Sequence, residues 1–218
     1  MKKIIAKIFS PWGLVPLIMA LLCNFVVYSG CNALTRNWNL HSLAIPLDKQ
    51  IPLIPWTIVI YFGCYIFWII GYLYNAAMDK RHCYRFLMAD WLAKAVCFIC
   101  YVVYPTTNTR PEIVGSDIWA QLMRFLYSMD AADNLFPSIH CLVSWLCYIG
   151  IRGNKKVPQW IRTTFCICAI AVFISTLTTK QHVIYDVVAG VALVEVTYRV
   201  SKLIVKKAVK KGKSNTEA

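Results

Sequence analysis

The chain has 218 residues, of which 59% are apolar and 15% are charged. Together with a mean hydropathy of +0.55, these proportions exclude an ordinary soluble domain, in which about 25% of residues are charged. The formal net charge is +13, but the basic residues lie in short clusters between apolar blocks and in a tail at 206–213. We therefore expect no nucleic-acid binding, and we attribute the charge to membrane orientation and to attraction by anionic lipid headgroups.

Long apolar blocks predict an all-α integral membrane bundle of six transmembrane helices, because a helix needs about 20 apolar residues to cross the hydrocarbon. The fourth block is short and needs a thinned bilayer to cross fully. No small-residue cleavage pattern closes the first block, so we expect it to remain as a span rather than to be removed as a signal peptide. In chain order the predicted spans are 11–30, 56–76, 86–104, 138–151, 160–178 and 183–205.

The basic loops set the predicted orientation. With six crossings, the clusters around Lys2, Lys80 and Lys155 share one side with the basic tail. The positive-inside rule makes that side cytoplasmic, together with both termini. We expect a single six-span domain over 1–218, in which 206–218 is a flexible cytoplasmic tail.

Two features of this framework receive structural interpretations. Apolar residues at helical spacing over 118–127 predict an amphipathic helix in the outer interface, either resting on the membrane or covering a site. Asp90 and Lys94 lie one helical turn apart in the third span and are expected to neutralise each other. Eight of the ten cysteines fall in predicted spans without the clustered partners of a zinc or redox centre, so we interpret them as packing residues.

Three polar clusters, at 104–111, 136–140 and 175–186, stand at span ends that six crossings bring to the same outer face. In the third cluster, His182 and Asp186 are four residues apart and therefore share one face of a helix. There Asp186 can accept a hydrogen bond from one imidazole nitrogen and leave the other nitrogen free to attack an electrophile. A buried His–Asp pair without a catalytic role is the alternative interpretation.

The other clusters supply further candidate residues. His140 follows Pro137-Ser138 at an expected helix start, where free N–H groups and the helix dipole favour a phosphate. Ser138 can cap that helix or donate its hydroxyl to a phosphate oxygen. Arg110 and Lys180 supply the fixed positive charge that phosphoryl transfer needs, although either one alone could anchor lipid headgroups.

In these three segments the sequence resembles the type 2 phosphatidic acid phosphatase superfamily. The signatures of that family are a basic segment ending in Arg-Pro, a Pro-Ser-x-His segment and a Ser-Arg-x5-His-x3-Asp segment. Three matches in the same order make the resemblance specific, and it covers the C-terminal half of the chain. The matching residues are Arg110-Pro111, Pro137-Ser138-Ile139-His140, and Ser175 with His182 and Asp186.

The resemblance implies a mechanism. His182 would attack phosphorus to form a phosphohistidine, Asp186 would orient His182, and His140 would protonate the leaving oxygen. No metal and no other cofactor would be needed. The residues that would hold the phosphate are Arg110, Ser138 and Lys180.

The sequence also departs from the family pattern at three positions. Val103 stands where a lysine is expected, and Thr176 stands where an arginine is expected, so Lys180 is a candidate replacement for one of these cations. Ile139 stands where the phosphatases usually carry glycine. This form, with the Thr-Lys-Gln-His segment that ends at His182, is similar to the branch that includes relatives of inositol phosphorylceramide synthase and sphingomyelin synthase.

Three functions follow, in order of preference. The first is an outward-facing lipid phosphatase in a bacterial cytoplasmic membrane, whose partners are membrane lipids and a lipid phosphate substrate such as phosphatidate, phosphatidylglycerophosphate or a polyprenyl diphosphate. The second is a phospho-headgroup transferase of the same fold, in which an alcohol replaces water as the acceptor. The third is a transporter or structural membrane protein without enzymatic activity. The sequence carries no signal for the oligomeric state.

Overall fold

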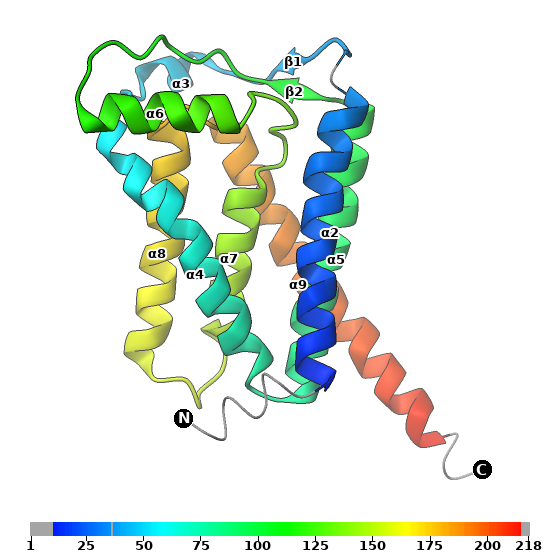
Figure 1. The fold of residues 1–218 in the computed structure, drawn as a ribbon. Coiled ribbons are helices and arrows are strands. Elements are labelled where there is room, and N and C mark those ends of the chain that lie inside the picture. The colour runs from blue at the N-terminus through cyan, green and yellow to red at the C-terminus, as the bar shows by residue number, and fades with distance from the viewer. Residues whose placement is uncertain (1–10, 36, 215–218) are drawn as a thin grey trace.

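The computed structural model describes residues 11–35 and 37–214, and its architecture is a bundle of long helices (Figure 1). Every predicted span coincides with one of the long helices, which are α2 (Pro11–Thr35), α4 (Ile58–Ala76), α5 (Lys80–Val103), α7 (Ile139–Arg152), α8 (Gln159–Thr178) and α9 (Ile184–Ser214). The short elements are β1 (His41–Ser42), α3 (Pro46–Gln50), the 3-10 turn η1 (Pro55–Thr57), β2 (Thr106–Thr107) and α6 (Ile118–Met129).

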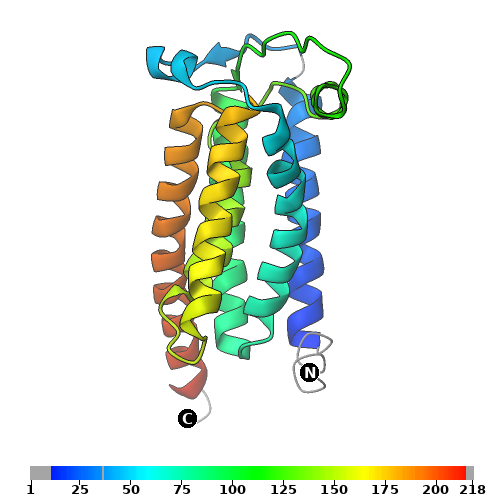
Figure 2. The same cartoon turned by 90° about the vertical axis from the view of Figure 1, so that its left-hand side faces the viewer.

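All of the short elements gather at one end of the bundle, as the two views in Figures 1 and 2 agree. There β1 and β2 form a parallel pair, with His41 opposite Thr106. The start of α2 and the end of α9 lie at the other end (Figure 1). The chain therefore enters and leaves the bundle at the same end.

Four helical stretches are long and apolar enough to cross a membrane: Leu17–Thr35, Pro55–Ala76, Lys80–Val103 and Gln159–Thr178. The helix α7 is apolar but shorter, and α9 carries acidic and basic residues along its length. The prediction of an all-α membrane protein is confirmed at this level.

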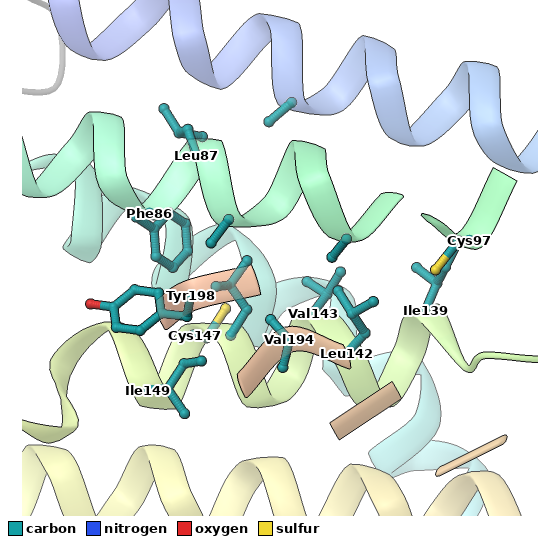
Figure 3. Packing of buried hydrophobic residues seen from close by; sticks show 14 of the residues in the cluster. Phe86, Leu87, Cys97, Ile139, Leu142, Val143, Cys147, Ile149, Val194 and Tyr198 are labelled. Carbon is teal, nitrogen blue, oxygen red and sulfur yellow. The ribbon is translucent and has the colours of Figure 1, made fainter. Parts of the chain in front are cut away.

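The short helix α7 lies at the centre of the bundle, where it contacts α4, α5, α8 and α9. Its 14 residues rise only about 21 Å, but most of its side chains are buried against protein rather than facing lipid. Figure 3 shows Leu142, Val143 and Cys147 of α7 beside Val194 of α9. A short helix is sufficient here, because the neighbouring helices cover it.

Polar and sulfur-containing side chains in the bundle behave as the sequence predicts. The Lys94 ammonium lies 2.9 Å from the Asp90 carboxylate, and both side chains are buried. The Tyr72 hydroxyl donates to the other oxygen of Asp90 at 2.8 Å. All ten cysteines lie in the described ranges and are free thiols there, and Cys97 and Cys147 belong to the main apolar core.

The structure corrects one prediction about the ends of the chain. The last helix does not end near residue 205 but continues to Ser214, so most of the basic segment 206–218 continues α9 as a helix. Residues 215–218 lie outside the described residues, as does the predicted basic cluster at Lys2.

The amphipathic helix predicted over 118–127 is confirmed as α6. It begins at Asp117, whose carboxylate accepts hydrogen bonds from the N–H groups of Trp119 and Ala120. Its buried residues Met123 and Leu126 pack on Ile58 and Tyr61 at the start of α4. The helix is therefore fixed to the bundle, across its end (Figure 2).

Candidate active site

The candidate site lies at the end of the bundle that carries α6, where the starts of α7 and α9 meet the end of α8. The two helix starts are joined directly, because the Ser138 N–H donates to the Asp186 carbonyl oxygen at 3.0 Å. A Cβ atom on Gly190 would lie 2.6 Å from the Ser138 carbonyl oxygen. Only glycine allows the backbones of α7 and α9 to approach this closely, and this approach brings His140 and His182 together.

The turn between α8 and α9 ends α8 in a Schellman motif. The N–H of Gln181 donates to the carbonyl oxygen of Thr176 at 3.0 Å, and that of Lys180 donates to Leu177 at 3.2 Å. Lys180 has a φ of 56°, at the position where glycine is the least strained residue. His182 follows directly, and its N–H also donates to Thr176, at 3.1 Å.

His182 and Asp186 form the pair that their spacing predicts. The His182 Nδ1 atom lies 3.2 Å from Asp186 Oδ2, and the exposed fractions of the two side chains are 7% and 1%. The same carboxylate oxygen accepts the N–H of Val183 at 3.0 Å, which caps the start of α9. With Asp186 ionised, the proton of His182 stays on Nδ1 and the Nε2 atom keeps its lone pair.

His140 completes a line of three side chains. Its Nδ1 atom lies 3.4 Å from His182 Nε2, and its Nε2 atom is buried without a hydrogen-bond partner among the described residues. Tyr61 and Trp68 of α4 hold the ring, with centroid distances of 4.6 Å and 5.4 Å.

Ser138 lies beside this line and is fully buried. Its hydroxyl oxygen accepts the N–H of Cys141 at 3.3 Å and so acts as the N-cap of α7. Ser138 does not line the cavity that holds the two histidines. Of its two predicted roles, capping is the one in which the structure places it.

Arg110 approaches the site through Gln181, the residue before His182. Its guanidinium donates to the side-chain oxygen of Gln181 and to the carbonyl oxygens of Asp130 and Ala131. It also stacks on Tyr127 at 4.8 Å from the ring centre. Arg110 thus joins the loop after α6 to the turn that carries His182.

The Lys180 side chain points away from Arg110, toward α3. Its ammonium donates to the carbonyl oxygens of Asp48, at 3.0 Å, and Ile51. Burial lowers the pKa of Lys180 from its ordinary value, and the charge of Asp48 opposes this shift. Both predicted cations are therefore bonded to protein oxygens near His182 rather than held free in the cavity.

Asp48 is a site residue that the sequence did not reveal. Its carboxylate accepts the N–H of Ile45 at 2.8 Å and the N–H of Ile184 at 2.8 Å. It therefore ties α3 to the first turn of α9, beside the His182 turn. The pattern Pro46-Leu47-Asp48 is typical of a helix start, but nothing in it indicates a partner 136 residues away.

A comparison with protein families decides the classification. A family model described as the PAP2 superfamily matches residues 33–200 of the chain. The chain belongs to the PAP2 superfamily. No curated protein and no solved structure gives a significant match. Membership confirms the resemblance read from the three polar segments and supports a lipid-related phosphatase or phosphotransferase function at the level of the superfamily.

The departures from the PAP2 signature can now be placed. Val103 is exposed at the end of α5, and Thr176 is buried in α8 with its hydroxyl bonded to the Phe173 carbonyl oxygen. Neither side chain can supply the missing positive charge. Among the described residues, no group of three or more His, Cys, Asp or Glu side chains is arranged to hold a metal ion.

The PAP2 histidines line a cavity of about 370 Å³ beneath α6, together with Asp130, Leu126 and Met129. Asn24, Tyr65 and Trp68 line this cavity and also a second one of about 310 Å³. The second cavity runs between α2 and α4, and its other lining residues are mostly apolar. The site therefore continues into an apolar groove along the helices that are long enough to span a membrane.

Proposed function

We propose that this chain is a six-span lipid phosphatase in a bacterial cytoplasmic membrane, with its active site at the extracytoplasmic face. In this proposal α7 and α9 cross the membrane with the four longer apolar stretches. The short elements and His182 are then outside, and the two chain ends are cytoplasmic. The common end of the first and last helices supports an even number of crossings, and the basic loops support this orientation.

The proposed reaction has two steps. First, the lone pair of His182 Nε2 forms a bond to phosphorus while the bond from phosphorus to the lipid oxygen breaks, and protonated His140 gives its proton to that oxygen. Second, water attacks the phosphohistidine, the bond from phosphorus to nitrogen breaks, and His140 takes back a proton. Asp186 holds His182 in the required tautomer throughout. The observation that carries the proposal is the line Asp186, His182, His140 at the wall of a cavity.

The apolar groove supports an amphiphilic substrate. A lipid chain lying between α2 and α4 would place its phosphate in the cavity of the two histidines, because the two cavities share Asn24, Tyr65 and Trp68. A soluble phosphate ester has no chain to fill this groove and should react more slowly.

The test is a panel of phosphatidate, phosphatidylglycerophosphate and polyprenyl diphosphate offered to the purified protein in detergent. We expect phosphate release from at least one lipid, and transient ³²P on His182 that is stable in base and lost in acid. Glycerol phosphate is the matched soluble control. Equal rates with the lipid and the soluble ester, or turnover without labelled protein, would contradict the proposal.

A second candidate function is transfer of the phosphorylated headgroup to an alcohol, and one observation favours it. His182 lines the histidine cavity and also a separate polar cavity of about 590 Å³, together with Lys180, Asp48 and Asn108. Water needs no such space, whereas a polyol acceptor would fit it. In the panel, a transferase should release little free phosphate with or without an alcohol, and when the alcohol is added mass spectrometry should detect its phosphate ester beside the dephosphorylated lipid.

A further inference from the structure

A second polar pocket lies at the opposite end of the bundle from His182. It has a volume of about 550 Å³ and is formed by α5, the end of α7 with the loop that follows it, and α9. Along α7 the distance from His140 to Arg152 is about 18 Å. We call this the basic pocket, and the charged side chains that line it are Arg85, Arg152, Lys155, Arg199, Lys202 and Glu195.

Arg85 is held in place on the wall of the basic pocket. Its guanidinium lies over the ring of Tyr198, 3.9 Å from the ring centre, and the Tyr198 hydroxyl donates to the Gly150 carbonyl oxygen at 3.4 Å. Figure 3 shows Tyr198 beside Phe86 and Ile149 of the core. The Nε atom of Arg85 is buried, and no described residue accepts a hydrogen bond from it. The guanidinium is thus held against Tyr198, with its Nε donor unused among the described residues.

The one carboxylate of the pocket is already neutralised. Glu195 forms two hydrogen bonds with the Arg152 guanidinium, at 2.6 Å and 3.1 Å, and accepts a third from the Trp145 indole at 3.0 Å. Arg199 lies farther away, at 3.7 Å. The charges of Arg85, Lys155 and Lys202 therefore have no acidic partner among the residues that line the pocket.

Membrane orientation explains why this end of the bundle is basic, but it does not require these cations to surround a hollow. Loose basic residues on a cytoplasmic loop would satisfy the positive-inside rule equally well. Cations from three separate segments converge here around a fixed arginine whose planar fork suits phosphate oxygens. Basic pockets between membrane helices at this level are suited to lipid headgroups.

We propose that the basic pocket binds a phosphate group, carried either by the headgroup of an anionic phospholipid or by a soluble phosphate. Arg85 donates to the phosphate oxygens, and Lys155 and Lys202 add charge at the mouth. The pocket is separate from the catalytic cavity, and none of its residues belongs to the proposed reaction. It therefore holds a bound anion that stabilises the inner ends of α5, α7 and α9.

The test compares two double variants of equal charge. Lys155→Gln with Lys202→Gln removes two exposed lysines of the pocket, whereas Lys156→Gln with Lys206→Gln removes two exposed lysines near it that do not line it. Binding of phosphatidylglycerol and of phosphatidylcholine is measured by native mass spectrometry in an uncharged detergent. Binding of inorganic phosphate is measured by the shift in Tm.

We expect the pocket variant to bind phosphatidylglycerol about 25-fold more weakly than the control variant, since each of the two headgroup-facing lysines contributes about a fivefold factor. Loss of inorganic phosphate binding in the pocket variant, without any preference for phosphatidylglycerol, would also support the site and would identify a soluble source. Equal losses in the two variants would overturn the proposal, as would a protein that binds neither probe. Both variants should keep full catalytic activity in detergent.

Discussion

The three residues His182, Asp186 and His140 differ from the two cations Arg110 and Lys180 in what their polar atoms contact. In the first group, His182 Nε2 and both nitrogens of His140 contact each other or no protein partner. In the second group, the side-chain nitrogens donate to backbone carbonyl oxygens and to Gln181. The imidazoles are thus available for chemistry, whereas the cations hold the surrounding loops together before any substrate is bound.

The largest effect is expected from His182→Ala. Loss of the nucleophile removes the covalent pathway, so the rate should fall by at least about 10⁴-fold, and no label should remain on the protein. The side chain is buried but lies at the wall of a cavity, so Tm should change little. A residual rate within tenfold of the parent chain would contradict the distinction between the imidazoles and the cations, because His182 would then be a structural residue like Arg110 and Lys180.

His140→Ala should be next, with a loss of about 10²–10⁴-fold for a lipid leaving group. The loss should be much smaller for p-nitrophenyl phosphate, because its leaving group needs no proton. Comparing the two substrates separates an acid from a ring that merely packs against Tyr61 and Trp68. Equal losses with both substrates would assign His140 a structural role.

Arg110→Lys tests the other side of the comparison. Lysine keeps the charge, but its single nitrogen cannot reproduce the planar fork of two nitrogens with which Arg110 reaches two carbonyl oxygens and Gln181. We expect a fall in stability of about 1–3 kcal/mol and a loss of activity of roughly tenfold. The matched control is Arg124→Lys in α6, whose guanidinium also donates to two carbonyl oxygens, those of Ile113 and Gly115, in an exposed position.

The control variant Arg124→Lys should keep full activity. If Arg110→Lys lost activity at unchanged Tm, Arg110 would bind phosphate directly and would not act by joining the loop after α6 to the turn that carries His182. If both variants lost activity equally, the effect would belong to the outer loop as a whole.

Lys180→Gly and Lys180→Ala should have smaller effects. Both remove the ammonium that donates to Asp48 and Ile51, but only glycine relieves the strain of a positive φ. The glycine variant should therefore be about 1 kcal/mol more stable than the alanine variant by thermal unfolding. The two should lose the same few-fold factor in activity if the charge matters, and full activity in both would remove Lys180 from the phosphate site.

The sequence predicted what depends on local spacing. The His182–Asp186 pair follows from four residues of helix, and the amphipathic helix at 118–127 follows from its apolar period. The sequence did not reveal what depends on tertiary folding, such as the reach of Asp48 to Ile184 or the placing of Tyr61 and Trp68 around His140. Long-range contacts of this kind have no period that a single sequence can display.

The sequence predicts helix ends less accurately than local pairs, but better than long-range contacts. The third span was predicted to begin at residue 86, but α5 begins at Lys80, because Asp79 accepts the N–H of His82 and caps the helix. Asp79 is a residue type that caps helices, but the charged residues at 80–85 do not belong to an apolar block. The direction of Arg110 could not be predicted in the same way, because it is set by the loop after α6.

The smallest effect is expected from removing metal ions. Two histidines and an aspartate are residue types that also bind zinc, although no such group among the described residues is arranged to hold a metal ion. In the proposed reaction His182 Nε2 bonds to phosphorus, and EDTA should therefore leave the rate unchanged. Phosphate release is measured before and after dialysis against EDTA, with the metal content checked. A loss of activity that zinc restores would show that His182, Asp186 and His140 bind a metal ion. The contrast with Arg110 and Lys180 would then be one between metal ligands and structural cations.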